Sequence, residues 1–141
     1  MATFVKFNKF VLQLGQKGYD FSNDTLKFAL TNTAPTAATD TVFDPTTKHP
    51  APAAANGYTS GGYAATTTWT ESEGKATLGC TTDVVITATA GGIGPFRYVL
   101  LYDDTNATDM LISYWDYGSS ITLAVGETFT VDVTASLLTL E

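Results

Sequence analysis

The sequence predicts an all-β protein, a jelly-roll-like β-sandwich with a short N-terminal helix and one long irregular loop. Thr occupies 26 of the 141 positions and aromatic residues make up 12 % of the chain, a composition that favours strands. From residue 66 onwards, short alternating segments are separated by turn signals every 8 to 12 residues, the spacing typical of sandwiches. The length suits one domain, residues 1–141, with a sizeable core.

The N-terminal third divides into three predicted parts. Residues 3–15 place Phe4, Phe7, Phe10, Val11 and Leu14 at spacings of three and four, which predicts an amphipathic helix that Gly15 and Gly18 would end. Residues 25–31, TLKFALT, alternate as a strand does. Residues 32–65 contain every proline but one, and we expect an extended loop or arm there.

The main part of the predicted sandwich is residues 66–141. Turns are expected at SEGK, GGIGP, DTNATD, DYGSS and AVGE, where Gly, Asp, Asn and Ser gather. The predicted strands between these turns are 66–71, 75–81, 83–90, 96–104, 110–118, 120–125 and 127–134, and residues 136–141 close the chain.

Charge and cysteine content exclude several classes of protein. The formal net charge of −7 would repel phosphates and anionic lipid, so we expect neither nucleic acid nor a membrane as a partner. The single cysteine excludes an internal disulfide. Lysines and Asn8 interrupt the apolar N-terminal residues, and no apolar run approaches a membrane span. The pattern is typical of a protein made in the cytoplasm without a signal peptide.

The glycine-rich stretch GGIGPFRYVLLYDDT, residues 91–105, raises the question of a phosphate-binding loop. Such loops lie between a strand and a helix, because the helix N-terminus meets the phosphates. Here Pro95 and a strand-like segment follow, and the spacing fits neither phosphate-binding pattern. We interpret the glycines as a tight turn with positive φ angles, with Pro95 at the start of the next strand.

No pattern in the chain predicts catalysis, a metal or a cofactor. His49 is the only histidine and Cys80 the only cysteine, so the usual triads and metal clusters are missing. Cys80 is predicted to be a buried small side chain. Glu71 ends the predicted strand 66–71 and Glu73 lies in the predicted SEGK turn, so they do not indicate a glycosidase pair. DDTNATD lacks the spacing of a calcium loop, which favours a solvated turn. We expect a protein that is not an enzyme.

Six residues are candidates for contact with a partner. The loop residues Phe43, His49, Tyr58 and Tyr63 either pack on the chain's own sheet or order against a neighbouring subunit. Arg97, the only arginine, is expected to form an internal ion pair with Asp116 or Asp103, or else an inter-subunit contact. Trp115, within YWDY, either packs in the sandwich or offers a surface for a sugar or partner.

Three segments together resemble a family of small bacteriophage virion proteins. They are FNKFVLQLGQKGYDFSNDTLKFALTNTAPT near the N-terminus, VVITATAGGIGPFRYVLLYDDT in the middle, and LISYWDYGSSITLAVGETFTVDV near the C-terminus. The resemblance covers about two thirds of the chain. It implies a helix before a strand and turn, and a β-sandwich whose second half contains the last two segments.

The resemblance also implies a structural role in the virion. The leading expectation is a capsid decoration or cement protein that binds the outside of the head and bridges the major capsid protein, as a homo-oligomer and in particular a trimer. A position in the neck or tail is the alternative. A carbohydrate-binding module that uses the aromatic residues of YWDY is a second alternative, and a glycoside hydrolase is the most remote.

Overall fold

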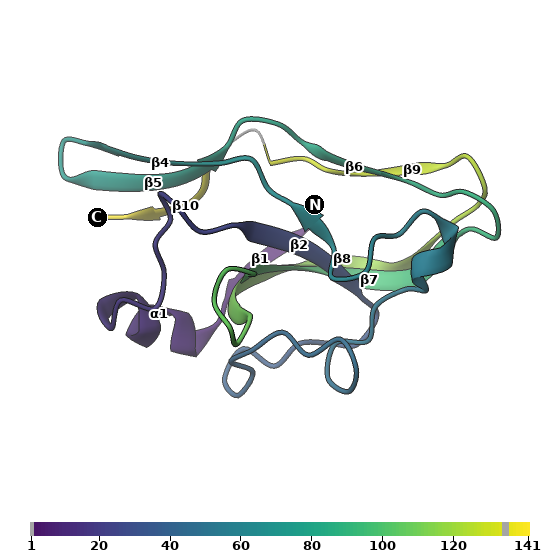
Figure 1. The fold of residues 1–141 in the computed structure, drawn as a ribbon, viewed down its shortest axis with the longest axis horizontal. Helices are drawn as coiled ribbons and strands as arrows, with labels where there is room; N and C mark the ends of the chain where they lie inside the picture. The colour runs from purple at the N-terminus through teal and green to yellow at the C-terminus, as the bar shows by residue number, and fades with distance from the viewer. Residues whose placement is uncertain (1, 134–135) are drawn as a thin grey trace.

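The computed structural model describes residues 2–133 and 136–141. It is an all-β sandwich of antiparallel sheets with one short α-helix, which confirms the predicted class. Figure 1 shows one large sheet in the middle, two small sheets above it and a long irregular segment below it. The central sheet is therefore covered on both faces.

The central sheet has the strand order β1-β8-β7-β2-β3. Its two long members, β7 (Ile93–Asp103) and β8 (Met110–Leu123), form a hairpin, and β2 (Leu26–Thr31) pairs with the other side of β7. Buried side chains are nearly continuous along β2, the second half of β7 and the start of β8. This pattern is expected of central strands that have both faces covered. The edges are β1 (Thr3–Lys6) and the two-residue β3 (Tyr63–Ala64).

Two small sheets form the opposite layer of the sandwich. One has the order β10-β5-β4 and contains β4 (Thr67–Ser72), β5 (Lys75–Cys80) and β10 (Ser136–Leu140). The other pairs β6 (Val84–Thr87) with β9 (Thr128–Val131). These five strands lie within one to three residues of predicted boundaries at most ends, because turn residues flank each of them. The last residue of the predicted strand 127–134 lies outside the described residues.

The N-terminal prediction was partly wrong. Residues Thr3–Lys6 are strand β1, which pairs with β8, and helix α1 spans only Asn8–Gly15. Phe7 and Phe10 are buried as the helical spacing required, but Val11 is exposed. The spacing of Phe4, Phe7 and Phe10 imitated a longer helix, whereas pairing with β8 satisfies the backbone of residues 3–6.

The predicted turn DYGSS was also wrong. Residues 110–123 form a single strand, and Asp116 and Ile121 pair with positions only two residues apart on β7. The extra residues between them bulge out of the ladder, and Gly118 takes a φ of 95° there. The glycine therefore accommodates a bulge that allows both ends of β8 to remain paired with β7.

The predicted turn at GGIGP is confirmed for Gly91 and Gly92 only, because strand β7 already begins at Ile93. Gly91 and Gly92 have φ angles of 93° and 75°, and they connect the segment after β6 to the start of β7. A Cβ on Gly92 would lie 2.4 Å from the carbonyl oxygen of Leu123, so the strands approach too closely there for a side chain. Pro95 lies inside β7, after a cis Gly94–Pro95 bond, at an irregular part of the β7–β8 register.

The segment from residue 32 to residue 62 folds back on its own sheet. Apart from the 3₁₀ turn Ala54–Asn56 it is irregular, as predicted, yet it buries Phe43 and Tyr58. Phe43 stacks on Tyr102 of β7 with ring centroids 4.4 Å apart. An isolated bridge between Val42 and Met110 also ties the segment to β8. The segment thus forms a third layer, the lower one in Figure 1.

Candidate functional site

The most distinctive surface feature is an apolar groove between the two layers of the sandwich, centred on Trp115. One part, of about 430 Å³, is bounded by β8 and β9, and an adjoining part of about 210 Å³ lies beside β1. Both parts share Trp115, Asp132 and Val133. The other lining residues are Ala2, Phe4, Val99, Tyr117, Phe129, Thr130, Val131, Ser136 and Leu137.

Aromatic contacts hold the groove in shape. The Trp115 ring packs edge to face against the Phe4 ring of β1, with ring centroids 5.4 Å apart. Its centroid also lies 5.9 Å from that of Phe28 in β2. The ring centroids of Tyr117 and Phe129 of β9 lie 6.1 Å apart. Edge-to-face ring pairs add stability beyond their buried area, so this wall is formed before any ligand arrives. Of the groove residues, only Trp115 was singled out from the sequence as a contact candidate.

The sequence prediction for Arg97 is confirmed. Its Nε donates to one oxygen of Asp116 at 2.7 Å and its Nη2 to the other at 2.9 Å. This hydrogen-bonded pair raises the pKa of Arg97 and holds the pKa of Asp116 below its usual range. The guanidinium also lies 5.3 Å from the ring centre of Tyr98. Two of the five N–H donors of Arg97 are thus engaged with Asp116, and the pair connects β7 to β8 within the central sheet.

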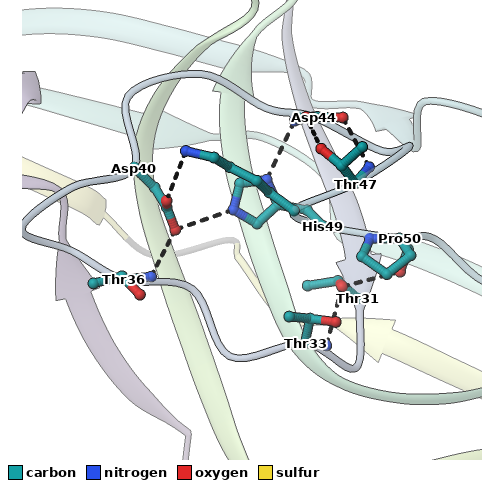
Figure 2. A network of polar contacts seen from close by, with 9 residues as sticks. Thr31, Thr33, Thr36, Asp40, Asp44, Thr47, His49 and Pro50 are labelled. Carbon is teal, nitrogen blue, oxygen red and sulfur yellow. Dashed lines mark hydrogen bonds and ion pairs between the residues drawn. The ribbon is translucent and has the colours of Figure 1, made fainter.

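His49 lies at the centre of a polar network inside the 32–62 segment. Figure 2 shows its ring between Asp40 and the backbone at Asp44. The Asp44 N–H donates to Nδ1 at 3.2 Å, so the ring proton is on Nε2, which lies 3.3 Å from the Asp40 carboxylate. The side chain is completely buried, and burial lowers the pKa of His49 although Asp40 opposes that shift. His49 is therefore a neutral structural residue.

The remaining members of this network fix the ends of the loop. Partial burial raises the pKa of Asp40, but hydrogen bonds from the Thr36 N–H, His49 and Lys48 outweigh it and lower the pKa overall. Asp44 accepts hydrogen bonds from Thr46 and Thr47, which lower its pKa. Figure 2 shows the contacts of Asp40 with Thr36 and of Asp44 with Thr47. The loop is thus closed by its own polar groups.

The other loop candidates differ in their exposure. Phe43 and Tyr58 are buried against the chain's own sheet, and the Tyr58 hydroxyl accepts the Leu30 N–H at 2.9 Å. Tyr63 is half-buried in β3, and its hydroxyl donates to the Gly57 carbonyl. Phe43, His49 and Tyr58 are therefore enclosed by the chain itself, and the expectation that they reach a partner is wrong for this conformation. Of the four loop candidates, Tyr63 alone leaves part of its side chain exposed.

The DDTNATD turn is less solvated than predicted. Asp103 ends β7 and is only 1 % exposed. Burial raises the pKa of Asp103 to about 6, and the nearby Asp24 adds to this rise. N–H groups of Thr105 and Asn106 donate to its carboxylate and oppose the shift. The burial of Asp103 continues the unbroken run of buried side chains in the second half of β7.

The residues considered from the sequence for catalysis or metal binding do not form a site among the described residues. Cys80 is buried as predicted, and burial raises the pKa of its thiol to about 11, so it is a poor nucleophile at neutral pH. Glu71 accepts the Gly74 N–H within the β4–β5 hairpin turn. Among the residues that the structure describes, no three His, Cys, Asp or Glu side chains are placed to hold a metal ion. None of the described helices is long and apolar enough to cross a membrane.

Comparison with known proteins yields no relative. No family model, no curated protein and no solved structure matches the chain. The choice of a candidate site therefore rests on the lining and shape of the groove alone. Sequence reasoning missed Phe4, Phe129 and Asp132 as parts of it, because β1 and the end of β9 are far apart in the sequence. The alternation of Phe129, Val131 and Val133 was the available signal for one wall.

Proposed function

We propose that this protein is a structural component of a bacteriophage particle, in which it decorates the outside of the head and binds the major capsid protein. The observation that supports this role best is the preformed apolar groove around Trp115. Both faces of the central sheet are covered by the chain itself, and the groove is a hollow that a partner segment could fill. The three sequence segments that resemble phage virion proteins support the class.

The mechanism requires no chemistry. A capsid segment that enters the groove would bury apolar surface across the joint between subunits. Any ligand that binds only the assembled shell stabilises that shell by mass action, and the resulting binding energy opposes rupture by packed DNA. The acidic surface, with a net charge of −7, keeps such a protein away from the nucleic acid itself.

Binding of purified protein to particles that lack it tests the proposal. We expect co-sedimentation with the shells and an increase in their heat resistance. Tyr117 lines the groove and is 51 % exposed, so Tyr117→Ala should weaken binding without unfolding the chain. Val125 is 65 % exposed and does not line the groove, so Val125→Ala is the matched control. Shells that keep normal composition and heat resistance without this protein would contradict the decoration role.

A position in the neck or tail is separated from decoration by copy number. A decorated head would carry on the order of hundreds of copies, whereas a closed ring at the neck would have roughly three to twelve. Quantitative gel analysis of intact particles therefore distinguishes the two positions.

The aromatic wall of the groove favours one further candidate, a carbohydrate ligand. Trp115 and Tyr117 lie beside the polar Thr130 and Asp132, a combination that suits stacking on a sugar ring and hydrogen bonding to its hydroxyls. Glycan-array binding that is lost in Tyr117→Ala and kept in Val125→Ala would support this function. Particle binding without glycan binding would reject it.

A further inference from the structure

Strand β1 leaves one edge of the central sheet open. It is the terminal strand of that sheet, and among the described strands it pairs with β8 alone. The Phe7 N–H continues this ladder by donating to the Ile112 carbonyl at 3.2 Å. Because hydrogen bonding alternates along an antiparallel strand, Thr3, Val5 and Phe7 direct their backbone groups towards β8. The backbone groups of Phe4 and Lys6 therefore point to the open edge.

This open edge carries an exposed aromatic side chain. Phe4 is 41 % exposed, although its ring packs against Trp115 on the groove side of the sheet. An edge with unpaired backbone groups and an exposed apolar side chain is a template for another strand, and soluble proteins usually protect such an edge. Covering Phe4 and pairing its N–H and carbonyl groups would satisfy both needs together.

The charges beside this edge are complementary to those of a second copy. Lysines are the only charged residues in the first 17 positions, and all 14 acidic residues follow them. Lys6 is exposed and, by strand alternation, lies on the same face as Phe4. Asp132 is exposed and lines the groove together with Ala2 and Phe4. Within the described ranges, neither Lys6 nor Asp132 has a salt-bridge partner.

We infer that β1 is a self-association site, where it pairs antiparallel with β1 of a second copy about a two-fold axis. With Phe4 opposite Phe4 of the second copy, Lys6 lies opposite the second copy's Ala2. Lys6 then comes next to the second copy's Asp132, because Ala2 and Asp132 line the same groove. A lysine at an edge normally prevents strand pairing, but here it meets a carboxylate. The central sheets of both copies become one continuous sheet.

This inference does not depend on a role in a virion. It also replaces the trimer expected from the sequence, because a self-complementary strand edge closes at two copies and leaves no free edge for a third. The alternation of backbone groups fits this register, since Phe4, Lys6 and Ala2 all belong to the outward-facing set. The two-fold axis gives the dimer two identical Lys6–Asp132 contacts.

Sedimentation equilibrium of the full chain at neutral pH tests the inference. We expect a reversible dimer whose dissociation constant rises with salt. Lys6→Glu and Asp132→Lys each place like charges together twice per dimer, so each should weaken association by roughly tenfold or more. The double variant Lys6→Glu/Asp132→Lys should restore it. Lys9→Glu, an equal charge change on the exposed face of α1, should leave the dissociation constant unchanged.

Circular dichroism melts of every variant ensure that only folded protein is compared. Both substituted positions are exposed, so we expect melting temperatures near that of the wild type. A wild-type chain that stays monomeric at about 1 mM, or that forms trimers, would overturn the inference. So would two single variants that dimerise normally, or a double variant that fails to recover. Loss of particle binding in a chain that still dimerises would count against the proposed function alone.

Discussion

Arg97 and Asp116 face each other across β7 and β8 as a two-pronged pair, with Nε and Nη2 each donating to a separate carboxylate oxygen at 2.7 Å and 2.9 Å. The pair lies beside the bulge of β8, and the same carboxylate accepts the Gly118 N–H at 2.8 Å. Asp116 therefore connects the only arginine of the chain to the residue that shapes the bulge. A planar, two-pronged contact fixes geometry in a way that a lysine does not reproduce.

Replacing Arg97 should change the titration of Asp116. The pair holds the Asp116 pKa below its ordinary value, so its stabilising effect is present above that ordinary value and is lost as pH falls through the lowered one. In Arg97→Ala we expect the pKa of Asp116 to return towards the normal range, with a small decrease in melting temperature at pH 7. NMR titration of the carboxyl carbon measures this, with Arg97→Lys as the control for charge without the fork. An unchanged Asp116 pKa would contradict the pair.

Asp103 should destabilise the protein at neutral pH. Its folded pKa of about 6 lies above the ordinary carboxyl value, so the fold favours the protonated form. The associated stability is complete below pH ~4 and is lost as pH rises through about 6. Asp103→Asn keeps an oxygen for the Thr105 and Asn106 N–H groups but carries no charge. It should raise the free energy of unfolding at pH 7.5 by an amount on the order of 2 kcal/mol.

Urea titrations of wild type and Asp103→Asn across pH 4 to pH 8 give the check. The two proteins should have similar free energies of unfolding near pH 4 and diverge above pH 6. Asp103→Ala is the control, because it removes the charge together with both hydrogen bonds. If Asp103→Asn were less stable than the wild type at pH 7.5, the carboxylate would be stabilising and the argument from burial would fail.

Local patterns account for what could be predicted from the sequence. Strands β4 to β9 have turn residues at their ends, and the Arg97–Asp116 pair follows from a lone arginine among a few nearby carboxylates. The groove could not be predicted, because strand pairing brings Phe4 beside Trp115 and the packing of two sheets brings Asp132 to them, all from distant positions. The third layer, residues 32–62, could not be predicted from the sequence either. A segment without regular period gives no register, so the burial of Phe43 on Tyr102 follows only from the folded chain.

Tyr58 provides a test of how firmly this third layer is attached. Its hydroxyl accepts the N–H of Leu30, a fully buried residue of β2. Tyr58→Phe keeps the ring but leaves that N–H without a partner, which should lower the free energy of unfolding by about 1 kcal/mol. Tyr63→Phe is the matched control, because its hydroxyl bond to Gly57 lies in an exposed region where water replaces it. Equal losses in both variants would contradict a specific role for the Leu30 contact.

His49 should make the attachment of the loop sensitive to acid. Burial lowers its pKa in the folded chain, so the unfolded chain takes up a proton first as pH falls below about 6.5. Stability associated with neutral His49 is therefore complete above pH ~6.5 and declines from there down to the lowered folded pKa. Protonation of Nδ1 would also remove the lone pair that accepts the Asp44 N–H, so this hydrogen bond should break when His49 becomes charged.

Two substitutions separate the packing of His49 from its hydrogen bonds. His49→Phe fills the site against Phe43, whose ring stacks 6.1 Å away, but leaves the Asp44 N–H unpaired, and should cost about 1–2 kcal/mol at pH 7.5. His49→Ala also opens a cavity and should cost about 3 kcal/mol. Because only the wild type titrates at this position, its advantage over His49→Phe should shrink as pH falls from 7 to 5. Amide exchange at Asp44, measured by NMR over the same range, should accelerate in the wild type. An advantage independent of pH would show that His49 does not titrate between the folded and unfolded chains.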